Sequence, residues 1–324
     1  MVRMTRRHAL LGSLLAAAPA VAQDAYPNRP VRLIVPFPPG NATDIFGRMI
    51  ADALSTRWPH RLVVENRAGG ASVIGLDAGA RSAPDGYTLI MGTSGPLAVN
   101  PTVMPRLIYD VERDFAPVTN IFTLPLVIVT SPAFEIGTVQ ALADRVRARP
   151  GEVTFASTGP ATAAHLAGEY FAQRVGGRMT HVPYRGSGPA IADLLGGSVQ
   201  LMMDSSASAM AGIEAGRTRA LAVTSLSRLP QLPDVPTVHE TVSPGFEAIG
   251  WGGLIAPAAT PRGIIDKVNA DVTAILRDPA VVARMLQMGA LSAPTTPDEF
   301  QAFIRSETRK WGEVARTANV RLEG

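Results

Sequence analysis

The chain has 324 residues and a mass of 34.1 kDa, and its 46% hydrophobic content argues against a disordered protein. It contains no cysteine, which excludes disulfide bonds and thiolate metal sites. The formal net charge is +3, but residues 1–22 hold three arginines and no acid, so the remainder carries 3 − 3 = 0. A neutral chain with 6% aromatic residues has no electrostatic footprint for nucleic acid. Its length predicts two α/β lobes.

Residues 1–22 have the pattern of a signal peptide. Three arginines precede an apolar run over residues 9–18, and residues 20–22 form an A-x-A cleavage motif. We therefore expect export and cleavage after Ala22. The pair Arg6-Arg7 leaves the general and the twin-arginine export routes both open.

The rest of the chain is organised around its first strand–loop–helix unit. Residues 31–35 (VRLIV) predict a buried strand, and the prolines and glycine of residues 36–40 prevent it from continuing. From Asp44 onward apolar residues recur at helical spacing, and Asn41 or Thr43 can cap that helix. Because N–H groups at a helix start are unpaired, this unit predicts a cradle for an anion. An ordinary βα turn has the same pattern, since the phosphate-loop lysine is absent.

Two more strands are predicted before residue 120, over 61–65 and 87–91, with a helix over 73–81 between them. The second of these strands runs into the loop Gly92-Thr93-Ser94-Gly95. Because parallel strands end at one edge of a sheet, we expect Thr93 and Ser94 to face the same crevice as the first loop.

Two apolar segments, residues 121–129 and 246–255, are predicted to cross between lobes, the first with a hinge near Pro125. Between the crossings, strands are predicted over 153–156, 179–183, 199–203 and 219–224, with helices over 139–147, 163–174, 189–195 and 207–215. Three terminal helices are predicted over 261–276, 280–288 and 297–318. This order predicts an inserted second lobe, residues 125–246, within a first lobe formed by residues 23–124 and 247–324.

The second lobe repeats the strand–loop–helix pattern at residues 153–174. Two such helix starts facing each other could hold a dicarboxylate, or one carboxylate from two sides. About four hydrogen bonds to a charged group, at about 1.5–3 kcal/mol each, reach micromolar affinity after ordering costs. His165 is either a packed histidine at this helix start or a donor to the pocket, and His181 is expected to be structural. Asp204 ends a strand, where it could accept from an amino or hydroxyl group of a ligand or cap the next helix.

Catalytic chemistry has weaker support. The five histidines show no metal-ligand spacing, and no G-x-S-x-G motif is present. Ser94 and Ser157 supply hydroxyls near the predicted crevice, so a periplasmic hydrolase or esterase is kept as the alternative. We expect no enzyme activity, no cofactor and no metal.

Several motifs in order then resemble one family. They are VRLIVPFPPGNATD, VVENRAGG, APDGYTLIMGTSG, DFAPVT, ASTGPATAAHLAGE, HVPYRGSGPAIADLLGG, RALAVTS, LPDVPTV and KWGEVA. The likeness is to the substrate-binding proteins of tripartite tricarboxylate transporters, the Bug-type receptors. It implies a two-lobed, type II-like periplasmic binding protein, each lobe a βαβ sheet flanked by helices, around a hinged cleft. It also implies a monomer that captures a small mono- or dicarboxylate for membrane permease subunits; a sensing receptor without a permease stays open.

The family's binding positions, carried over by motif, lie in both loops and in the cleft walls. They are Phe37, Gly40, Asn41, Ala42, Thr43, Asp44, Thr93, Ser94, Ser157, Thr158, Gly159, Ala161, Thr162, His165, Tyr184, Gly186 and Asp204. The chain departs from the family at Asn41, where a second glycine is common, and at Pro160, which has no N–H. Both changes fall in the loops expected to contact the ligand, so the resemblance does not identify the solute.

Overall fold

The computed structural model describes residues 26–322, so the expected signal peptide lies outside the described residues. The strands are β1 Val31–Val35, β2 Leu62–Asn66, β3 Thr88–Thr93, β4 Phe115–Thr130, β5 Thr154–Ser157, β6 Thr180–Pro183, β7 Leu201–Ser205, β8 Arg219–Val223, β9 Ile249–Pro257 and β10 Leu291–Ser292. The helices are α1 Ala42–Ser55, α2 Val73–Ala80, the π-helix η1 Gly95–Val99, α3 Asn100–Val103, α4 Val111–Asp114, α5 Val139–Ala148, α6 Ala163–Arg174, α7 Ser187–Gly196, α8 Ser206–Glu214, α9 Val238–Thr241, α10 Arg262–Leu276, α11 Pro279–Gln287 and α12 Pro297–Thr317.

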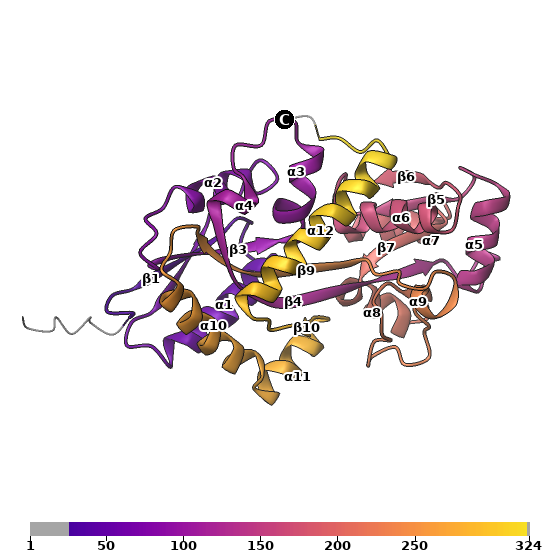
Figure 1. Cartoon of the computed structure of the whole chain (residues 1–324). Coiled ribbons are helices and arrows are strands. Elements are labelled where there is room, and N and C mark those ends of the chain that lie inside the picture. The colour runs from indigo at the N-terminus through magenta and orange to yellow at the C-terminus, as the bar shows by residue number, and fades with distance from the viewer. Residues whose placement is uncertain (1–25, 323–324) are drawn as a thin grey trace, which may run out of the picture.

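Two groups of parallel strands are joined by a central antiparallel pair (Figure 1). β2, β1 and β3 are parallel at one side, and β7, β5 and β6 are parallel at the other. β9 and β4 lie between them and pair antiparallel with each other and with their outer neighbours. The chain is therefore α/β with two sheet halves. We call residues 26–124 and 247–322 lobe 1, and residues 125–246 lobe 2.

β4 is longer than the predicted crossing strand, because its first half also pairs with β9. That pairing runs from Phe115 to Pro125, and pairing with β7 begins at Leu126. Pro125 therefore lies where β4 exchanges its lobe 1 partner for its lobe 2 partners. A proline has no N–H to donate to a ladder, which suits a position where pairing changes.

One buried hydroxyl joins the two crossing strands at this junction. Thr224 is fully buried, and its Oγ1 accepts from Leu126 N at 2.9 Å. The same hydroxyl donates to Ala248 O at 2.6 Å, just before β9. The backbone N of Thr224 donates to Leu126 O at 2.9 Å and its O accepts from Ala248 N at 2.9 Å, so this one residue links four backbone groups at the junction.

Helix α12 crosses both lobes rather than completing lobe 1 alone (Figure 1). It packs against η1, α3 and β4, and also against α6 of lobe 2. Glu307 is buried on this helix, and its Oε2 accepts from the indole N–H groups of Trp251 at 2.9 Å and Trp311 at 2.8 Å. These bonds connect α12 to β9, because Trp251 lies in that strand.

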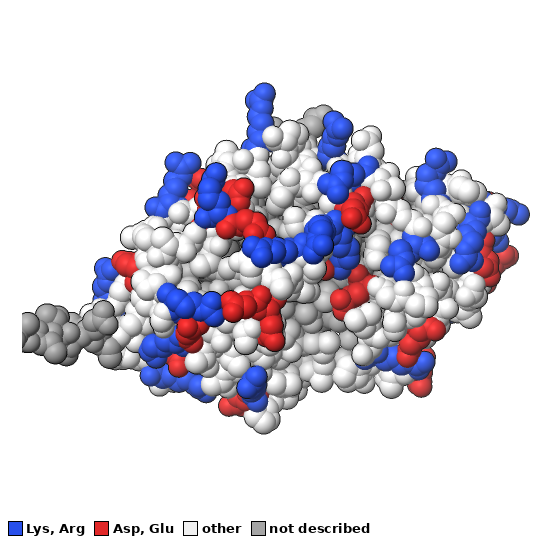
Figure 2. Space-filling view, viewed as in Figure 1, with Lys and Arg blue, Asp and Glu red and all other residues white. Residues whose placement is uncertain are grey.

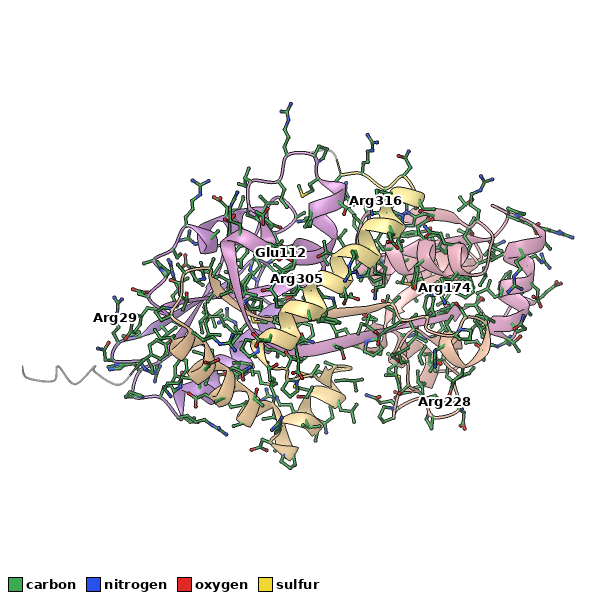
Figure 3. The ribbon with its side chains drawn as sticks, viewed as in Figure 1. Arg29, Glu112, Arg174, Arg228, Arg305 and Arg316 are labelled. Atoms are coloured by element: carbon green, nitrogen blue, oxygen red, sulfur yellow. The ribbon has the colours of Figure 1, made fainter. Side chains whose placement is uncertain are left out.

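Lysine and arginine side chains are interspersed with acidic ones on the face covered by α12 (Figure 2). Arg305 of α12, for example, points toward Glu112 of α4 (Figure 3), and their closest atoms are 2.6 Å apart. Over residues 26–322, no helix combines the length and apolar character that a membrane crossing needs.

Candidate ligand-binding cleft

A cavity of about 510 Å³ lies where the two lobes meet. Seven helices have residues of their first turn, or of the loop before it, in its wall: α1, α2, η1, α3, α6, α7 and α8. All except α3, which comes directly after η1, follow a strand of one of the parallel groups, namely β1, β2, β3, β5, β6 or β7. The two groups run in opposite directions, and they pair with different parts of the crossing strands. The end of β3 therefore lies near Phe122 and the end of β7 lies at Leu126, so the carboxyl ends of the two groups face each other across this part of β4. The start of an α-helix of several turns, such as α1 or α6, carries about half a positive charge, which favours an anion there.

The first loop is closed by its own side chains. Asn41 is the N-cap of α1, with φ −72° and ψ 156°, and its Oδ1 accepts from Thr43 N at 2.7 Å. Gly40 has a positive φ of 84°, and its N–H donates to Asp44 Oδ2 at 2.9 Å. Burial raises the pKa of Asp44, but hydrogen bonds from Arg48 and its other partners outweigh it, so the net shift is downward. Asp44 therefore holds the loop as a carboxylate rather than facing the cavity.

The second loop reproduces this geometry. Thr162 is the N-cap of α6, with φ −72° and ψ 162°, and its Oγ1 accepts from His165 N at 3.3 Å. Ala161 has a positive φ of 55°, and its N–H donates to His165 Nδ1 at 3.0 Å. In each loop the cap accepts from one amide of the first helical turn, that of Thr43 in α1 and that of His165 in α6. Among the described hydrogen bonds, none has the amide N–H of Ala42 or Ala163 as donor.

His165 and His181 form a stacked pair behind the second loop, with ring centroids 3.6 Å apart and an interplanar angle of 9°. Burial lowers the pKa of His165 to about 3, with a further contribution from His181, and burial lowers the pKa of His181 to about 4. His181 Nε2 lies 2.7 Å from Ser157 Oγ, which also donates to Gly159 O at 3.0 Å. The structure thus places His165 as a packed, neutral histidine that supports the loop.

Ten of the predicted residues line the cavity. They are Phe37, Asn41, Ala42, Thr43, Thr93, Ser94, Thr158, Ala161, Thr162 and Asp204. Seven lie outside its lining: Gly40, Asp44, Ser157, Gly159, His165, Tyr184 and Gly186. Most of these seven residues stabilise the loops through hydrogen bonds of their backbone or side chains. Tyr184, for example, donates its hydroxyl to Asp193 at 2.7 Å, away from the cavity.

The sequence reasoning missed two groups of lining residues. The first group is polar and follows other strand ends or helix starts: Ser72, Asn100, Ser187, Ser205 and Ser208. The rule that predicted Thr93 and Ser94 would have found Ser187 and Ser205, since they follow β6 and end β7. The second group comes from the crossing strands and is mainly apolar: Phe122, Leu124, Leu126, Gly250 and Trp251. No local pattern marks this second group.

Asp204 is the one ionisable residue in the lining, and no lysine, arginine or histidine of residues 26–322 contributes to it. Burial raises the pKa of Asp204 to about 6, although hydrogen bonds from Ser187 and Ser205 lower it in part. Within the same residues, no group of three or more potential ligand side chains could hold a metal ion. Apart from the Asp204 carboxyl group, the polar groups of the lining are therefore amides and hydroxyls.

Comparison with known proteins gives the family of the chain. The family model described as "Tripartite tricarboxylate transporter family receptor" matches residues 46–320. Protein BugT of Bordetella pertussis is 41% identical over 99% of this chain and 100% of its own length. The structure titled R. palustris Rpa4515 with adipate is 34% identical with a TM-score of 0.78, and covers 91% of this chain and 99% of that one.

A third relative, MatC from Rhodopseudomonas palustris with bound malate, is 29% identical with a TM-score of 0.73. The match covers 89% of this chain and 99% of MatC. Similarity over nearly the whole described chain confirms the predicted α/β, two-lobed binding-protein architecture. The chain belongs to the tripartite tricarboxylate transporter family of receptors.

Proposed function

We propose that this protein is a periplasmic receptor that captures a small organic anion between its lobes. It then presents the anion to the membrane permease of a tripartite tricarboxylate-type transporter. The observation that carries the proposal is the convergence of helix starts from both lobes on one cavity whose described lining contains no cationic side chain. Similar proteins were solved with adipate and with malate, which are both carboxylates.

The two opposed loops supply the contacts. Ala42 of α1 and Ala163 of α6 are the first residues of their helices, and both line the cavity. Their amide N–H groups face a ligand from different lobes, so one bound carboxylate stabilises the closed arrangement. Apolar side chains such as Phe122 and Trp251 pack against the carbon skeleton. We propose that Pro125, where β4 changes partners, marks the hinge for this closure.

The hydrolase alternative receives no support from the serines. Ser157 makes the closest hydroxyl–imidazole contact, but it is 0% exposed and lies outside the cavity lining. Ser94 lines the cavity, but no histidine of the described chain does so with it. We therefore propose binding without catalysis.

A panel of mono- and dicarboxylates, examined by thermal shift and isothermal titration calorimetry, tests the proposal. We expect saturable binding of at least one acid, with a higher melting temperature and no product by chromatography. As the control for hydrolysis, the protein is incubated with a panel of simple esters and the products are measured by chromatography. Turnover of an ester, or no binding of any organic anion, would contradict the proposal.

A further inference from the structure

Asp204 holds a fixed place in the lobe 2 wall of the cavity. It lies in β7, between β4 and β5, and its backbone is in register with Val127 of β4. Its side chain is 1% exposed. Two donors bind the same carboxylate oxygen: Ser187 Oγ lies 2.7 Å and Ser205 N lies 2.9 Å from Oδ1. These bonds fix which oxygen of Asp204 faces the starts of α7 and α8.

The other oxygen, Oδ2, has no hydrogen-bond partner and less than 1 Å² of exposed surface. Neither protein nor bulk water satisfies this atom, although nearly all buried polar groups in folded proteins are paired. An unsatisfied buried acceptor is destabilising, and more so when it is charged. Asp204 lines the cavity and the terminal torsion of an aspartate is soft, so a donor group of a bound ligand is available to satisfy Oδ2 after rotation of the carboxyl group.

The surroundings make Asp204 an acceptor. No other ionisable side chain of the described residues lines the cavity, so no cation there neutralises it. Ser187 and Ser205 also line the cavity, and the Ser187 hydroxyl already donates to Oδ1 of Asp204. With a pKa of about 6, the carboxyl is largely ionised at pH 7.5. A ligand group that donates hydrogen bonds completes this site, whereas a second carboxylate is repelled from it.

We propose that Asp204 is a specificity-determining residue whose free oxygen accepts a hydrogen bond from an amino or hydroxyl group on the bound organic acid. The proposal rests on the function proposed above, because the carboxylate of the ligand binds the helix starts while its donor group reaches Asp204. The receptor therefore selects amino or hydroxy acids over plain acids with the same carbon skeleton. A charged hydrogen bond corresponds to a preference of about 10- to 150-fold in Kd.

Calorimetry with matched acids at pH 7.5 tests this assignment. The probes are succinate, malate and aspartate, together with adipate and 2-aminoadipate, so that each set differs only in its donor group. Asp204→Asn is the test variant: Ser187 and Ser205 still donate to the amide oxygen, which places an NH₂ donor at the position of Oδ2. Asp144→Asn, an exposed acid on α5, is the matched control for loss of charge.

For the wild type, we expect the acid with an amino or hydroxyl group to bind at least about tenfold more tightly than its plain counterpart. Asp204→Asn should remove that preference by weakening the donor-bearing acid, with the plain acid changed by less than about threefold. Equal binding within each set by the wild type, or parallel losses in Asp204→Asn, would overturn the assignment. If Asp204→Asn fails to fold, the comparison of matched acids with the wild type still tests the assignment. If neither the acids of this panel nor other organic anions bind, the proposed function is wrong as well.

Discussion

The amide of Ala42 offers a clean test of the first loop, because proline can replace Ala42 without disturbing α1. Ala42 is the first residue of the helix, where proline is well tolerated, and α11 and α12 of this chain begin with Pro279 and Pro297. The preceding Asn41 has an extended backbone with ψ 156°, which is the conformation that a following proline requires. No described hydrogen bond uses the N–H of Ala42.

Ala42→Pro therefore removes one donor to the ligand and nothing from the fold. A hydrogen bond to a charged carboxylate contributes about 1.5–3 kcal/mol, so the Kd of the tightest-binding acid should rise by about 10- to 150-fold. The free energy of unfolding in urea should change by less than about 0.5 kcal/mol. Ala163→Pro makes the same change in lobe 2, since Thr162 before it has ψ 162°, and should weaken binding similarly.

Val111→Pro is the matched control, because Val111 begins α4 after an extended Asp110 and lies outside the cavity lining. Calorimetry gives the Kd of each variant, and urea denaturation followed by circular dichroism gives its stability. Thr43→Pro is a less clean variant, because the N–H of Thr43 donates to Asn41 and its loss costs about 1 kcal/mol of stability. Wild-type affinity in Ala42→Pro would refute the role of the α1 amide.

Three further predictions concern stability. Thr224→Val deprives two buried backbone groups of their hydroxyl partner and should lower the free energy of unfolding by about 2–4 kcal/mol, whereas Thr224→Ser should lose less; equal urea midpoints for the two would contradict this. The lowered pKa values of His165 and His181 mean that below about pH 6.5 the unfolded chain binds protons that the folded chain does not. The histidine pair should therefore lower the free energy of unfolding below that pH, by up to about 1.4 kcal/mol per pH unit for each histidine toward pH 4, a slope that His181→Asn should reduce if the pair is its source. The raised pKa of Asp204 acts in the opposite direction over part of this range. A Cβ at Gly168 would overlap the Phe155 ring, so Gly168→Ala should lower the free energy of unfolding by about 1–3 kcal/mol; an unchanged melting temperature would show that α6 shifts without cost.

The local chemistry of the sequence predicted most of the fold. Runs such as VRLIV and the caps Asn41 and Thr162 depend on residues close in the chain, so their strands and helices lie near the predicted bounds. The shortest elements, including η1, α3, α4, α9 and β10, were not predicted. Such short elements have little intrinsic stability and form where packing holds them. The full length of β4 was missed for a related reason, since its first half becomes a strand by pairing with β9.

The cavity likewise has features that follow from local sequence and features that depend on tertiary structure. The sequence by itself determined that polar loops follow buried parallel strands, because strand ends and helix caps depend on residues that are close together in the chain. Only the tertiary structure decided that Phe122, Leu126 and Trp251 form a wall of the cavity, because these side chains meet through pairing between distant strands. It also decided that His165 supports a loop and that one oxygen of Asp204 has no partner. The hydrogen-bond partners of a buried group come from residues that are distant in the chain and meet only through packing. A local pattern of residues therefore does not predict them.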